Sequence, residues 1–143
     1  MATQTDNSDC PRRANPESLR LRALSAALTA WDLQKSVAWY RDVVGFTLEQ
    51  SWEQGGKVVG VALIAGDVRM NISQDDGARR KDRVKGQGIR LYMSTVQSVD
   101  QIATRIKERG GTLESEPTDT PWGARVFSMV DPDGFTITIT SMG

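Results

Sequence analysis

The sequence contains no histidine and only one cysteine, and both scarcities restrict the chemistry open to this chain. A chain without histidine lacks the commonest metal ligand and the side chain whose charge changes most readily near neutral pH. The single cysteine, Cys10, cannot form a disulfide within the chain, which favours a reducing, cytoplasmic compartment.

The charge balance and the polar leader argue against two classes of partner. The chain has 18 basic and 18 acidic residues, whereas nucleic-acid binding requires a clustered basic excess. The densest basic run, residues 79–85, is expected to be a solvated linker. The leader, residues 1–20, has no apolar stretch long enough for a membrane span and is expected to be disordered. We therefore expect neither a nucleic acid nor a membrane as partner.

Two halves of the chain repeat one pattern of residues. Residues 45–49, Gly-Phe-Thr-Leu-Glu, are echoed by residues 110–114, Gly-Gly-Thr-Leu-Glu. On both sides of these segments, apolar residues alternate with polar or small ones, which is typical of half-buried strands. The alternating segments are residues 24–29, 68–73, 89–94 and 135–140. Each half is therefore predicted to run strand, helix, then several strands, as after an internal duplication.

Local signals place the helix ends and one turn. Asp32 can accept hydrogen bonds from free backbone amides, so a helix is predicted to start after it and to end at Gly45. A second helix is predicted from about Ser98 to Arg109, closed by a glycine in the same way. Residues 131–134, Asp-Pro-Asp-Gly, predict the turn of a hairpin.

Three segments resemble the vicinal oxygen chelate superfamily, which includes glyoxalase I, extradiol dioxygenases, fosfomycin-resistance enzymes and bleomycin-binding proteins. Residues 32–46 look like its first helix and turn, and residues 120–125 and 131–134 look like its final hairpin. The resemblance implies an α+β fold of two tandem βαβββ modules, whose mixed, curved sheets form a cleft.

The same resemblance implies how the chain is organised. A single domain over residues 21–143 would hold module one at about 21–74, a linker at about 75–87 and module two at about 88–141. It also implies a homodimer, in which modules from both chains complete each pocket.

Metal enzymes of this family carry their ligands at four equivalent strand positions. By resemblance these positions fall on Ser25, Asn71, Arg90 and Thr138. The third position could also be read as Leu91, but the strand alternation assigns Leu91 to the core. Two hydroxyls, an amide and a guanidinium do not form a zinc or iron site, and arginine has no lone pair to donate. We therefore expect no metal and no cofactor.

What remains is a polar cleft suited to a small organic ligand, either anionic or aromatic. Arginines at the cleft would favour an acidic group and would disfavour cationic bleomycin. Alternatively, Arg69 and Arg125 pair with Glu49, Glu53 or Glu114, and the tryptophans cover core or dimer contacts. The predicted ligand-binding residues are Ser25, Trp52, Arg69, Asn71, Arg90, Tyr92, Trp122, Arg125 and Thr138.

Three functions remain open. The first is a metal-free small-molecule binding protein, such as a resistance or sequestration factor. The second is a metal-independent isomerase, cyclase or lyase, although Tyr92 is the only acid or base assigned to the cleft face unless a carboxylate such as Glu49, Glu53 or Asp67 is misplaced. The third is a structural or regulatory dimer. The sequence leaves the catalytic residues unknown and leans away from an enzyme, and a metal-dependent glyoxalase or dioxygenase is disfavoured.

Overall fold

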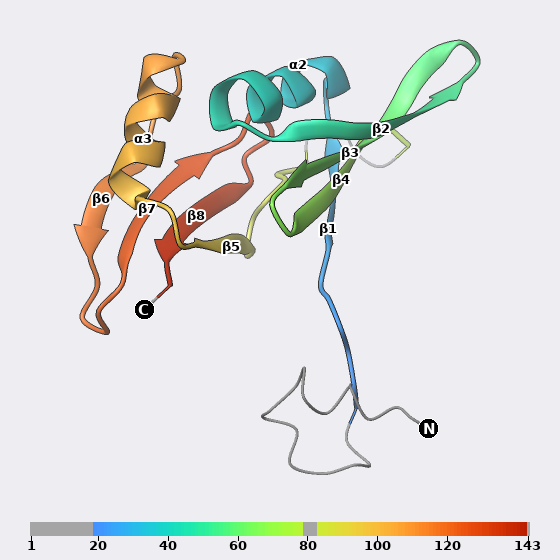
Figure 1. Cartoon of the computed structure of the whole chain (residues 1–143). Helices are drawn as coiled ribbons and strands as arrows, with labels where there is room; N and C mark the ends of the chain where they lie inside the picture. The colour runs from blue at the N-terminus through green and yellow to red at the C-terminus, as the bar shows by residue number, and fades with distance from the viewer. Residues whose placement is uncertain (1–18, 79–82, 143) are drawn as a thin grey trace.

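Two four-stranded sheets, each with its own helix, make up the described part of the chain (Figure 1). The computed structural model describes residues 19–78 and 83–142. The expectations for the leader and for the middle of the basic run therefore fall on residues 1–18 and 79–82, outside the described residues.

The first sheet has the strand order β1-β4-β3-β2. Strands β1 and β4 pair in parallel, whereas β2, β3 and β4 are joined as antiparallel neighbours. The elements of this half are β1 (Ala26–Ala30), α2 (Leu33–Ala38), η1 (Trp39–Val44), β2 (Thr47–Gln54), β3 (Lys57–Ala65) and β4 (Val68–Gln74).

The second sheet repeats this topology with the order β5-β8-β7-β6. Its parallel pair is β5 and β8, and the turn at residues 131–134 joins β7 and β8 as the predicted hairpin. The elements of this half are β5 (Arg90–Thr95), α3 (Val99–Glu108), β6 (Ser115–Asp119), β7 (Arg125–Val130) and β8 (Thr136–Ser141). The α+β fold of two tandem βαβββ units is thus as expected.

The helix ends follow the local signals of the sequence. Asp32 accepts a hydrogen bond from the backbone N–H of Lys35 at 3.2 Å, and Ser98 caps α3 in the same way. Gly45 ends the first helical segment with a φ of 115°, a conformation that favours glycine. The continuation of α2 as the π-helix η1 was not predicted from the sequence.

One apolar core fills the space beneath both sheets. It combines Leu28, Met70 and Ile72 from the first sheet with Phe127 and Ile137 from the second. Helices α2 and α3 pack on these apolar faces, because the alternation of each strand directs every second side chain toward them. The opposite faces of the sheets carry no helix of the described chain, and we call them the polar faces.

Hydrogen bonds between the halves fix how they meet. The phenol of Tyr40, in η1, donates to Asp131 Oδ2 at 2.6 Å, and both side chains are buried. Asp133 accepts from the backbone N–H of Trp31 and from the Ser36 hydroxyl, each at 2.8 Å. The turn between β7 and β8 therefore serves as the docking point for the first helical segment.

The end of the basic run departs from the expectation of a solvated linker. Lys85 is only 7% exposed, and its ammonium group donates to Asp75 at 2.6 Å and also to the Thr29 hydroxyl. The same group lies 4.1 Å from the ring centroid of Trp31, and Arg83 pairs with Asp75 as well. This part of the run is tied to the first sheet because a lysine can pair there with a buried carboxylate and an aromatic face.

Among the helices in the described ranges, none combines the length and apolar character needed to cross a bilayer.

Candidate functional site

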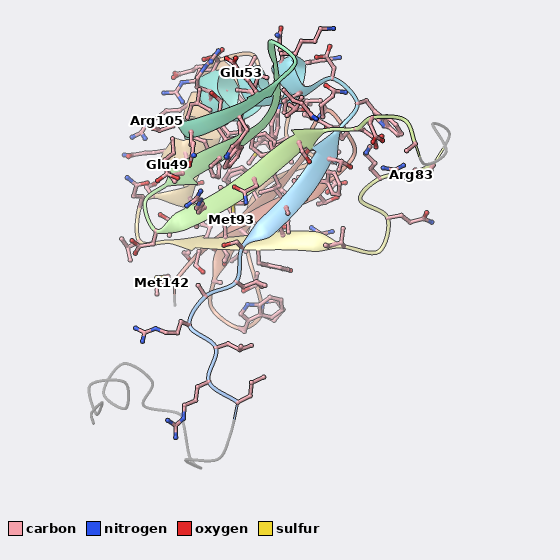
Figure 2. The ribbon with its side chains drawn as sticks, turned by 90° about the vertical axis from the view of Figure 1, so that its right-hand side faces the viewer. Glu49, Glu53, Arg83, Met93, Arg105 and Met142 are labelled. Carbon is pink, nitrogen blue, oxygen red and sulfur yellow. The ribbon has the colours of Figure 1, made fainter. Side chains whose placement is uncertain are left out.

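The polar faces present the side chains that the sequence assigned to the cleft. On β4, Met70 and Ile72 are buried in the core, so Asn71 between them points to the polar face of the first sheet. On β5, Leu91 packs against the core while Arg90 and Tyr92 are exposed. In Figure 2 the strands of the first sheet stand in front, and the helices lie behind them.

Arg90 is held in one orientation by two hydroxyl groups. Its Nη1 donates to Thr138 Oγ1 at 2.8 Å and to Ser128 Oγ at 3.2 Å. Those two hydroxyls are themselves 2.8 Å apart and are buried. Within residues 19–78 and 83–142, no carboxylate forms an ion pair with Arg90.

This anchoring leaves a defined edge of the guanidinium group available. Arginine has five N–H donors in a planar fork, and the two hydroxyls engage only Nη1. The Nε–H and Nη2–H groups point along the other edge, which matches the two oxygens of a carboxylate side by side. Arg90 is therefore prepared to receive an acidic group without first losing the freedom of its own side chain.

Asn71 carries an unsatisfied acceptor on the first sheet. Its register neighbours are Ala27 on β1 and Ala62 on β3, whose side chains carry no polar group. The Asn71 amide oxygen is buried and has no hydrogen-bond partner among the described residues. A buried acceptor without a donor costs about 1–3 kcal/mol, so a donor brought by a ligand would recover free energy there.

Trp52 forms an aromatic wall on the same face. It pairs in register with Gly60, and its Cε3 atom would lie 3.3 Å from a Cβ placed on that glycine. The indole therefore lies across β3 beside Ser73, and 40% of Trp52 remains exposed.

Three other predicted residues contribute less defined features. Arg69 lies 3.4 Å from Glu49 in an exposed ion pair, which is one of the alternatives considered for it. Tyr92 is the register neighbour of Thr138 and is 64% exposed. Ser25 is exposed and immediately precedes β1.

Arg125 departs from the inward orientation that was considered for it. Its guanidinium group donates two hydrogen bonds to Asp100, the nearer at 2.8 Å, and one to Asp119 at 3.0 Å. Asp100 belongs to α3, so Arg125 reaches toward the helix-covered side of its sheet. The hydrogen bonds from Arg125 to Asp100 lower the pKa of the Asp100 carboxyl group. Trp122, in the nearby turn, is 74% exposed.

The chemistry of these faces does not fit the metal that the fold would suggest. No cluster of three or more His, Cys, Asp or Glu side chains occurs among the residues with described coordinates. At the four equivalent positions the groups are hydroxyl, amide, guanidinium and hydroxyl, and a cation would meet the fixed positive charge of Arg90.

Sequence reasoning missed Ser128, although a signal for it was present. The turn at residues 131–134 predicts a hairpin that brings Ser128 near Thr138, and the observed register, with residues 131–135 between the paired Val130 and Thr136, places the two opposite each other. It also missed a cavity of about 840 Å³ between the two halves, into which α3 directs Arg105 and Arg109.

Comparisons with known proteins agree with the architecture. The family model for the Glyoxalase/Bleomycin resistance protein/Dioxygenase superfamily matches residues 22–139. No curated protein matches the sequence.

Solved structures share the fold at low sequence identity. TioX from Micromonospora sp. ML1 is 20% identical with a TM-score of 0.69, over 84% of this chain and 98% of that one. The virulence protein STM3117 from Salmonella typhimurium is 21% identical with a TM-score of 0.67, over 88% of this chain and 100% of that one. A superfamily member from Sphaerobacter thermophilus is 21% identical with a TM-score of 0.66, over 86% and 98% of the two chains. Such similarity carries the fold and no particular ligand.

Proposed function

Because the chain belongs to the Glyoxalase/Bleomycin resistance protein/Dioxygenase superfamily, we propose that it binds a small organic acid on its polar faces without a metal. Binding alone, rather than turnover, is the proposed activity. The observation that carries the proposal is the anchored guanidinium group of Arg90, which has no carboxylate partner in the described chain.

The first support is electrostatic. A ligand carboxylate along the free edge of Arg90 would make two charge-assisted hydrogen bonds, which are about twice as strong as neutral ones. Because Ser128 and Thr138 already fix the side chain, little conformational entropy is lost on binding.

The second support concerns the rest of the ligand. Trp52 offers an exposed aromatic surface, and Asn71 offers a buried acceptor in need of a donor. An apolar or aromatic body with one hydrogen-bond donor would satisfy both, as in ligand sites that combine apolar walls with a few oriented polar groups.

We further propose that a second copy of the chain completes the site. The two polar faces belong to different sheets, and neither is covered by a helix of the described chain. Tyr92 and Trp122, 64% and 74% exposed, leave large aromatic surface in contact with solvent. Large exposed apolar surface is typical of interaction sites.

The test compares aryl carboxylates with the corresponding aryl amides, for example 2-naphthoate with 2-naphthamide, by calorimetric titration. The acid should bind more tightly, and Arg90→Gln should weaken its binding about 10–100-fold, because a charged hydrogen-bond pair is worth about 1.5–3 kcal/mol. Arg41→Gln, which removes an equal charge from an exposed pair with Asp42, should have no effect. Treatment with a chelator should also leave binding unchanged.

Three results would contradict the proposal. Equal affinity for acid and amide would remove the role given to Arg90. Equal loss in both arginine variants would show that only the overall charge matters. Consumption of the ligand during the titration would instead favour the metal-independent enzyme.

A further inference from the structure

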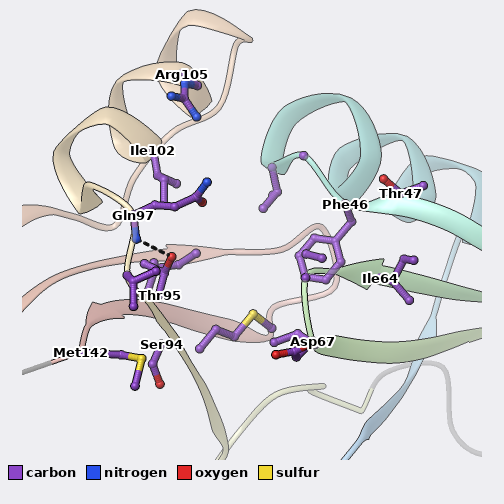
Figure 3. A pocket seen from close by; sticks show the side chains of 18 of the residues that line it. Phe46, Thr47, Ile64, Asp67, Ser94, Thr95, Gln97, Ile102, Arg105 and Met142 are labelled. Atoms are coloured by element: carbon purple, nitrogen blue, oxygen red, sulfur yellow. Dashed lines mark hydrogen bonds between the residues drawn. The ribbon is translucent and has the colours of Figure 1, made fainter.

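The cavity between the two halves lies apart from the polar faces. It is bounded by the end of η1, the turn between β3 and β4, the end of β5, and α3 (Figure 3). Its apolar lining includes Phe46, Met93, Ile102 and Ile139, and it extends from the common core. Its volume of about 840 Å³ lies within the range of about 300–1,000 Å³ typical of ligand pockets.

Two arginines for which the described residues supply no acidic partner border this apolar space. Arg105 and Arg109 lie one helical turn apart at the end of α3, and both line the cavity. Neither guanidinium group makes an ion pair or a hydrogen bond with another described residue. Lys107, between them in sequence, differs because it pairs with Glu116 at 2.8 Å.

Arg109 extends from α3 toward the other half. Its Nη1 would lie 3.4 Å from a Cβ placed on Gly45, at the end of η1. The guanidinium group therefore spans the gap between the two helical segments, where it borders the cavity.

The remaining charge on the lining is acidic and lies on another wall. Asp67, in the turn between β3 and β4, lies across the cavity from Arg105 in Figure 3. An acidic ligand group would be repelled by Asp67 and attracted by the two arginines, which sets the orientation of any elongated acid.

We propose that this cavity binds an amphipathic organic acid, with its acidic group between Arg105 and Arg109 and its apolar body against Phe46 and Ile102. The charge pattern favours this occupant over a segment of protein. A segment covering the cavity would have to desolvate two guanidinium groups, which costs free energy unless it supplies carboxylates of its own. A small acid brings the compensating charge with it.

Calorimetric titration with decanoate tests the proposal, with decyltrimethylammonium as the probe of equal chain length and opposite charge. We expect decanoate to bind at one site per chain and the cation at least 10-fold more weakly. The double variant Arg105→Gln, Arg109→Gln should lose at least 10-fold in decanoate affinity. Lys107→Gln is the matched control on the same helix, and its affinity should equal that of the unmodified chain.

Five results would overturn the proposal. The first three are failure of decanoate to bind, binding of the cation as tight as that of the acid, and a loss in Lys107→Gln as large as that in the double variant. Loss of decanoate binding in Arg90→Gln but not in the double variant would assign the acid to the polar faces instead. Light scattering at each titration concentration supplies the fifth, because decanoate binding confined to a dissociated monomer would mean that a second copy occupies the cavity.

Discussion

The buried hydrogen bond between Tyr40 and Asp131 permits a sharp test of how the two halves hold together. Tyr40→Phe removes only the hydroxyl that donates to Asp131 at 2.6 Å. The ring keeps its edge contacts with Trp39 and Phe46, whose centroids lie 4.8 and 5.7 Å away. The carboxylate keeps two backbone donors on its other oxygen. The substitution therefore isolates one contact between the halves.

The expected cost follows from the charge and burial of the pair. A hydrogen bond to a charged group contributes about 1.5–3 kcal/mol, so the free energy of unfolding should fall by about 2 kcal/mol. At about 4 °C per kcal/mol for a chain of this size, the midpoint of thermal unfolding should fall by about 8 °C. Denaturant unfolding followed by tryptophan fluorescence measures the free energy of unfolding, and calorimetry measures the midpoint of thermal unfolding.

Tyr92→Phe is the matched control, because the chain contains only these two tyrosines. Tyr92 is exposed and makes no described hydrogen bond, so the free energy of unfolding of the Tyr92→Phe protein should differ from that of the unmodified chain by less than about 0.5 kcal/mol. If the two variants lose the same amount, the reasoning is wrong. In the Tyr92→Phe protein, tyrosinate absorbance should not develop before unfolding, because burial and the Asp131 carboxylate raise the pKa of Tyr40.

The cost of Tyr40→Phe should also depend on pH. Burial raises the pKa of Asp131 above its ordinary value of 3.8, although the phenol and two backbone amides oppose that shift. Because the pKa of Asp131 is raised on folding, ionisation of its carboxyl group opposes folding. The contribution of this group to stability is therefore greatest below about pH 3.8 and is lost as the pH rises through the folded pKa. The hydrogen bond that Tyr40→Phe removes has a charged acceptor only above the folded pKa of Asp131. The difference in the free energy of unfolding between Tyr40→Phe and the unmodified chain should therefore be smaller in acid than at neutral pH.

Three other predictions follow from separate features. The pKa of Asp75 is lowered to about 2, chiefly by its hydrogen bond with Lys85. The contribution of the Asp75 carboxylate to stability should therefore be complete above about pH 3.8 and should decrease as the pH falls toward 2. In Asp75→Asn, the midpoint of thermal unfolding should decrease less between about pH 3.8 and pH 2 than it does in the unmodified chain. Gly86→Ala should lower the thermal midpoint more than Gly88→Ala, because only the first Cβ would come within 2.3 Å of a backbone oxygen, although both glycines have positive φ. Incubation with Zn²⁺, Fe²⁺, Mn²⁺ or Ni²⁺ should leave no stoichiometric metal after desalting, because the polar faces lack an imidazole or carboxylate ligand set.

The repeated architecture could be predicted because its signals are local. Strand alternation, the capping side chains of Asp32 and Ser98, and the glycine after each helix act within a few residues of where they stand. Two features depended on more distant groups. The π-helix η1 ends where the backbone N–H groups of Gly45 and Phe46 both donate to the Tyr40 carbonyl oxygen, a pattern without a residue signature. The burial of Lys85 depends on Asp75 and other groups brought together only by folding.

In the candidate site, too, some features follow from local signals and others depend on distant residues. Alternation correctly separated Arg90 from Leu91, because a strand has a fixed period of two. The partner of Arg125 could not be read from the sequence, since Asp100 lies 25 residues away on a helix whose packing had to be known. The cavity beside α3 is a property of how two halves meet, and neither half encodes it alone.

The docking turn makes the two halves unequal although they share one topology. Asp131 and Asp133 receive the donors of the first helical segment, but the corresponding turn of the first half consists of Gly66 and Asp67 alone and lacks this pair of aspartates. A chain built from two first halves would therefore leave the Tyr40 phenol and the Ser36 hydroxyl without this pair of acceptors. The second half therefore supplies a docking turn that a copy of the first half would lack.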